Sequence, residues 1–215
     1  MSVTTYPKTS AGRTRPAGTR PAGTRPAGTG PARALLRRWP TALALALTLP
    51  GLFSGGDGES GGAVDAFGEA LPLLPLLYLV VTRIGRPRWT WPVLGAGVAA
   101  MAALRATGVV APSTVLVAAA LGVLLWGAVR GTPHGAAVSG LQSAGAVLFC
   151  GLAVAGLAAD PELGRYLVAA GWFLHGVWDF VHLRMRRLEG VVAPTFAEWC
   201  GVVDVVIAAE LLFAH

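Results

Sequence analysis

The chain has 215 residues, of which 54% are hydrophobic and only 13% are charged. Soluble domains carry about 25% charged residues, so this composition excludes an ordinary water-soluble domain and indicates that lipid is the main solvent. The formal net charge of +6 does not indicate nucleic-acid binding, because the basic residues follow the loops and form no single basic face.

Residues 1–38 form a polar, basic segment rich in proline, glycine and threonine. A five-residue repeat, Thr-Arg-Pro-Ala-Gly, begins at Thr14 and recurs from Thr19 and from Thr24. Such a segment buries too little apolar area to offset its ordering entropy, so we predict a disordered tail. Its arginines also favour contact with anionic lipid headgroups, by about 1 kcal/mol each.

Residues 39–215 contain a series of long apolar segments, which predicts an all-α polytopic transmembrane helix bundle of about seven spans. The predicted spans are Trp39–Ser54, Ala66–Thr82, Thr90–Gly108, Pro112–Ala128, Gly135–Ala159, Pro161–Leu183 and Pro194–Ala214. The first is short and contains Pro50, and it also fits a signal sequence, whose cleavage would leave six spans. Pro72 and Pro75 lie inside the second span and predict a kink there.

Predicted loops that are rich in arginine alternate along the chain with loops that are poor in it. A cytoplasmic N-terminus places fifteen of the seventeen basic residues inside and leaves only Arg105 and Arg165 toward the outer face. The positive-inside rule therefore predicts a multi-pass protein with N-in, C-out orientation in the cytoplasmic membrane of a bacterium. Near the outer face, Glu69 is an intramembrane acid that we expect to pair with Arg105 or Arg165.

Most of the remaining intramembrane ionisable groups lie in the last two predicted spans. His175, Asp179 and His182 are separated by four and three residues, which places them on one face of a helix. Cys200 and Asp204 share a face of the next helix in the same way. Counting from the cytoplasmic ends of two antiparallel helices brings the five residues together, which predicts a polar site in the cytoplasmic half of the membrane.

Three interpretations of this site stay open, and Gln142 of the fifth span is a further polar candidate for it. The polar groups could fix helix packing through hydrogen bonds. They could bind a transition metal, zinc or iron, with Asp179 or Asp204 as a catalytic base in a hydrolase-like membrane enzyme. They could also carry protons or a small solute across the membrane.

The stretch AGWFLHGVWDFVH (170–182), followed by EWCGVVD (198–204), resembles an uncharacterised family of small polytopic membrane proteins from high-GC Gram-positive bacteria. The resemblance covers the chain from about Phe67 onward and implies no activity. A looser analogy is to the seven-helix metal-dependent membrane hydrolases related to alkaline ceramidases and adiponectin receptors. Those families carry a His-x-x-x-His zinc motif on the last helix, whereas here Asp179 takes the second position, on the penultimate span.

Overall fold

The computed structural model describes residues 38–53, 60–130 and 133–213. The chain divides into two units between Leu36 and Arg37, and all described elements belong to the second. The disordered tail and the headgroup contact expected for residues 1–38 lie almost wholly outside the described residues and stay predictions. Every regular element in the described ranges is helical, which confirms the all-α prediction.

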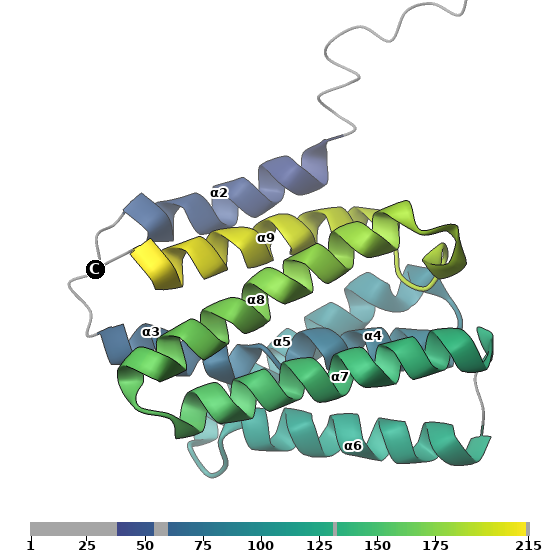
Figure 1. The fold of residues 1–215 in the computed structure, drawn as a ribbon, viewed down its shortest axis with the longest axis horizontal. Coiled ribbons are helices and arrows are strands. Elements are labelled where there is room, and N and C mark those ends of the chain that lie inside the picture. Colours follow the sequence, from purple (N-terminus) through teal and green to yellow (C-terminus); the bar gives the residue numbers. More distant parts are fainter. Residues whose placement is uncertain (1–37, 54–59, 131–132, 214–215) are drawn as a thin grey trace, which may run out of the picture. The chain divides into compact units, whose positions relative to one another are not determined.

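Eight α-helices and two short 3₁₀ turns make up the described chain (Figure 1). In order they are α2 (Trp39–Phe53), α3 (Ser60–Ala70), α4 (Leu73–Ile84), η1 (Pro87–Trp89), α5 (Thr90–Thr107), α6 (Pro112–Arg130), α7 (Gly135–Ala158), α8 (Pro161–Arg184), η2 (Arg186–Leu188) and α9 (Pro194–Phe213). The helix limits agree with the predicted spans to within two residues, apart from the start of the second span. The prolines, glycines and polar residues between apolar runs therefore mark the helix ends well.

The second predicted span is two helices rather than one kinked helix. It begins at Ser60, earlier than the predicted Ala66, and α3 and α4 are separated by a turn at Leu71 and Pro72. Pro75 has no N–H to donate to the Leu71 carbonyl, which instead accepts a 3.2 Å bond from Leu74 N. The Trp172 indole of α8 donates to the Phe67 carbonyl at 3.1 Å and so anchors the end of α3.

Three segments within the described ranges are long and apolar enough to cross a membrane: Gly62–Ile84, Pro112–Arg130 and Gly135–Ala158. The apolar part of α2, Trp39–Pro50, is shorter. Helices α8 and α9 have spanning length but include buried acids, which lower their hydropathy. Length and composition therefore establish three potential spans, and the other predicted spans need a different argument.

The most extensive helix pair is α8 with α9, and α2 packs along the other side of α9 (Figure 1). Thr41 Oγ1 of α2 donates a 2.6 Å hydrogen bond to Glu198 Oε1 of α9, and Ala44 is completely buried. Helix α2 is thus part of the folded bundle. Helices α3 and α7 contact α8, and α4 contacts α5, α6 and α7.

Two glycines allow α8 and α9 to approach closely. A Cβ at Gly176 would lie 3.1 Å from Asp204 Cβ and 3.1 Å from the Gly201 carbonyl oxygen, and a Cβ at Gly201 would lie 3.2 Å from Asp179 Cβ. These separations are tighter than ordinary side-chain packing, so even a methyl group would require its neighbours to shift by a few tenths of an ångström. Small residues are typical of membrane helix contacts. Here they hold the aspartates of the two helices side by side.

Candidate metal centre

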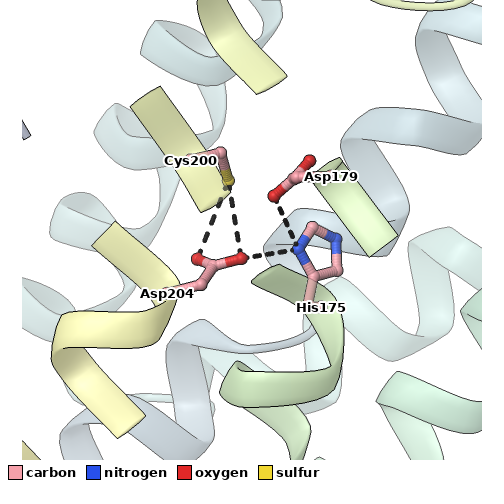
Figure 2. Close-up of side chains that lie close together, drawn as sticks. All are labelled: His175, Asp179, Cys200 and Asp204. Atoms are coloured by element: carbon pink, nitrogen blue, oxygen red, sulfur yellow. Dashed lines mark hydrogen bonds and ion pairs between the residues drawn. The ribbon is translucent and has the colours of Figure 1, made fainter. Parts of the chain in front are cut away.

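Four predicted site residues meet between α8 and α9 (Figure 2). His175 and Asp179 lie one helical turn apart on α8, and Cys200 and Asp204 lie one turn apart on α9. Figure 2 shows the four side chains pointing toward one another. His175, Asp179 and Asp204 are 0% exposed and Cys200 is 1% exposed, so the cluster lies fully inside the protein.

The imidazole of His175 lies between the two carboxylates. Its Nδ1 is 2.8 Å from Asp204 Oδ2 and 3.3 Å from Asp179 Oδ2. The Cys200 thiol lies 3.7 Å from Asp204 Oδ1 and 3.9 Å from Oδ2. The shorter histidine distance is that of an Nδ1–H donating to Asp204, which joins the two helices through one hydrogen bond.

Tyr78 of α4 completes the surroundings of the cluster. Its hydroxyl donates a hydrogen bond to Asp179 Oδ1, and its ring is 1% exposed. The ring also packs against His175 with a centroid separation of 5.6 Å. Sequence reasoning missed this contact because it paired only the last two helices. One signal was present: Tyr78 lies five residues before Arg83, as Asp179 lies five before Arg184, so both have the same predicted depth.

Two buried polar atoms of the cluster have no hydrogen-bond partner within the described structure, Asp179 Oδ2 and His175 Nε2. The ion pairs of Asp179 and Asp204 with described residues are both with His175. Two carboxylates therefore share one imidazole in a site closed to solvent. Buried charge is costly unless it is paired or coordinates a metal, so this arrangement favours an additional cation.

The donor atoms suit a transition metal. One ligand atom from each of His175, Asp179, Cys200 and Asp204 can be chosen so that all lie within 4.8 Å of one another. A tetrahedral zinc site with bonds of about 2.0–2.3 Å has ligand separations of about 3.3–3.6 Å. Zinc takes this mixture of nitrogen, thiolate and carboxylate ligands, and Fe(II) accepts histidine with carboxylate. A small contraction of the present arrangement would bring the four donors to a common centre.

His182 does not join the cluster, so the predicted five-residue set reduces to four. Its Nδ1 donates to the Trp178 carbonyl at 2.9 Å, and its Nε2 lies 2.8 Å from Gln142 Nε2, which fits donation by the amide. Both ring nitrogens are thus occupied. The reason is axial distance: His182 lies seven residues, or about 10 Å, along α8 from His175. Gln142 therefore contacts His182 rather than the cluster.

Glu69 also lies apart from the cluster. Its Oε2 pairs with Arg105 Nε of α5 at 3.3 Å, and Arg105 also donates to the Ala66 carbonyl at 2.9 Å. Of the two predicted partners, the structure selects Arg105. This ion pair connects α3 to α5.

A cavity of about 300 Å³ reaches the cluster from the side of α5. Cys200 and Asp204 form part of its wall, and Arg105 lies among its lining residues. The other lining side chains are mainly apolar. The cluster therefore borders a space large enough for a ligand, although its own atoms are buried.

Comparison of the chain with protein-family models, with curated proteins and with solved structures gave no match. The function therefore has to be argued from the site and its surroundings.

Proposed function

We propose that this chain is a multi-pass integral membrane protein. The observation that supports this is an inverted distribution of polarity. Only 28% of the apolar window of α6 and 33% of that of α7 are buried, so these helices present apolar faces outward. The fully buried residues include His175, Asp179 and Asp204. A water-soluble fold buries apolar residues and exposes charges, whereas a membrane protein turns ionisable groups toward the bundle interior.

We further propose that α5, α8, α9 and α2 cross the membrane with the three apolar segments, giving the seven predicted spans. Asp179 of α8 and Asp204 of α9 lie between the two helices rather than toward lipid, which lowers the cost of inserting them. Half-exposed Trp39 and Trp89 lie at the starts of α2 and α5, where interfacial tryptophans are common. The positive-inside rule supports an N-in, C-out orientation in a bacterial cytoplasmic membrane.

The cluster of His175, Asp179, Cys200 and Asp204 is proposed to be a metal centre, with zinc as the ion. The convergence of four fully buried donors of three chemical types carries this proposal. A divalent cation would balance the two carboxylates and would be coordinated by Asp179 Oδ2, which has no hydrogen-bond partner in the described structure. The Tyr78 hydroxyl would orient the Asp179 carboxylate by its hydrogen bond to Oδ1, as outer-shell hydrogen bonds do for metal ligands.

The activity that this centre best supports is that of a hydrolase-like enzyme acting within the membrane. Cys200 and Asp204 border the cavity, so a substrate there would approach the centre from one side. Zinc in such a position supplies an electrophile for a carbonyl oxygen and a source of hydroxide at neutral pH. The buried helix pair would hold the reacting groups away from bulk water.

Two buried cysteines offer a matched test of the ligand set. Cys200→Ala is expected to weaken zinc binding by more than about 100-fold, because a lost ligand costs more than a lost outer-shell partner. Cys150→Ala removes a similar buried thiol from α7, outside the cluster, and is expected to keep the parent's affinity. The measurement is zinc affinity in detergent by competition with a chromophoric chelator.

Equal zinc affinity in the two cysteine variants would contradict this ligand set. If the parent itself binds no zinc or iron, the metal proposal fails. The hydrogen-bonded chain from Tyr78 through Asp179 and His175 to Asp204 would then stand as a packing or proton-transfer network.

A further inference from the structure

The cavity beside the cluster lies between α5 and α9, with contributions from α3, α4 and α8. The two helices are joined where they begin. Thr90 Oγ1 accepts a 3.0 Å bond from Ala193 N, and Trp91 Nε1 donates to Thr195 Oγ1 at 3.2 Å. Beyond these contacts the cavity separates them. Val98, on the wall formed by α5, is 52% exposed, so the cavity opens on the surface that would face lipid.

The cavity is elongated along α5. The residues of α5 that line it run from Leu94 to Arg105, a rise of about 16 Å. This length and the largely apolar lining fit an extended hydrocarbon chain.

Of the α9 residues that line the cavity, Trp199 is the nearest to the start of the helix. Trp199 lines the cavity, and its indole Nε1 is buried without a hydrogen-bond partner in the described structure. Trp199 lies five residues into α9, about 7.5 Å from its start. Bilayer headgroup regions are about 5–8 Å thick on each side, so this donor would lie where lipid headgroups give way to acyl chains.

We infer that the cavity binds one acyl chain of an ester-linked glycerolipid, with the ester carbonyl accepting a hydrogen bond from Trp199. The next residue, Cys200, belongs to the cluster, as does Asp204 one turn further on, so the carbonyl would lie beside the centre. The acyl chain would run along α5 toward Arg105, which Glu69 holds in place. This inference rests on the proposed hydrolase-like function and names its substrate class.

A photoreactive lipid tests the position of the acyl chain. The full-length protein is reconstituted into vesicles with phosphatidylglycerol that carries a diazirine in one ester-linked chain. Labelling of peptides around Val98 and Val203 is expected in the parent and is expected to fall at least fivefold in Val98→Trp, which adds a large ring to the cavity wall. Val147→Trp is the matched control, since Val147 is 64% exposed on α7 and lines no part of this cavity. Equal labelling in Val98→Trp and the parent would overturn the inference.

The carbonyl contact is tested with Trp199→Phe, which keeps the ring but removes the donor. Binding of the ester-linked lipid is expected to weaken about fivefold, the effect of one hydrogen bond, while an ether-linked analogue binds as before. An unchanged preference for the ester would refute this contact. Zinc content is measured in the same preparations. If the zinc content is stoichiometric but Val98→Trp is labelled as strongly as the parent, only the lipid site is refuted. If zinc is absent but Val98→Trp lowers the labelling, only the metal centre is refuted.

Discussion

Removing the metal with a chelator is expected to lower the midpoint of thermal unfolding of the purified protein by about 10 °C. A ligand present at about 1,000 times its Kd stabilises the folded state by about 4.1 kcal/mol. For a protein of this size, each kcal/mol shifts the midpoint by about 2–4 °C. Without the cation, the buried Asp179 and Asp204 share the imidazole of His175 as their one ion-pair partner among the described residues. The midpoint is measured in detergent by tryptophan fluorescence, with and without chelator.

Two controls separate loss of the metal from other effects of the chelator. The Cys200→Ala variant lacks one of the proposed ligands, so its midpoint is expected to be low already and to change little on chelation. Addition of zinc in slight excess is expected to restore the parent's midpoint but not the variant's. A parent protein that unfolds at the same temperature with and without chelator would contradict the metal centre.

Replacing Tyr78 by phenylalanine is expected to lower zinc affinity by about 10- to 100-fold, the usual effect of losing an outer-shell hydrogen bond. The Tyr78 hydroxyl donates a hydrogen bond to Asp179 Oδ1, so phenylalanine removes this contact and keeps the ring. The variant also leaves a buried acceptor unpaired, which costs about 1–3 kcal/mol of stability. Zinc affinity is measured by chelator competition, and stability by thermal unfolding.

Tyr166→Phe is the control for this variant, because Tyr166 is half-exposed on α8 and is not part of the cluster. It is expected to change neither zinc affinity nor stability. If Tyr78→Phe is destabilised but binds zinc as tightly as the parent, Tyr78 serves packing alone. Its proposed orientation of Asp179 would then be wrong.

Sequence spacing predicted the central part of the cluster. Residues four apart on a helix share a face, which paired His175 with Asp179 and Cys200 with Asp204. Antiparallel counting from the cytoplasmic ends then placed His175 opposite Asp204, and the structure has them 2.8 Å apart. Both steps needed only helix geometry and adjacency in the chain. The roles of the four residues as metal ligands stay a proposal.

The prediction of the cluster's residues failed in two places, where distance along a helix or contact between helices far apart in the sequence was decisive. His182 shares a face with His175, but the cluster is shorter than the two turns that separate these residues, so His182 contacts Gln142 instead. Tyr78 comes from α4, which is far from α8 in the sequence, and no rule of adjacency would pair them. The partner of Glu69 was easier to predict, because only two basic residues were predicted on its side of the membrane.

The two helices that carry the candidate site have a less clear spanning composition than α6 and α7. Helices α6 and α7 carry almost no ionisable residues and have a clear spanning composition. Helices α8 and α9 have the same length but carry Asp179 and Asp204, and fall outside that criterion. Asp179 and Asp204 add to the polarity of these helices, and the fold buries both residues between α8 and α9. A composition criterion therefore misses a helix whose polar residues face the bundle interior, which is the arrangement proposed for α8 and α9.

The most direct test of the proposed metal centre is to identify the metal in the purified parent protein and to examine its ligands by X-ray absorption spectroscopy. The structure predicts about one zinc ion per chain, with one sulfur ligand at about 2.3 Å from Cys200 and nitrogen or oxygen ligands at about 2.0–2.1 Å. A protein without stoichiometric metal, or a metal without a sulfur ligand, would contradict the centre formed by His175, Asp179, Cys200 and Asp204.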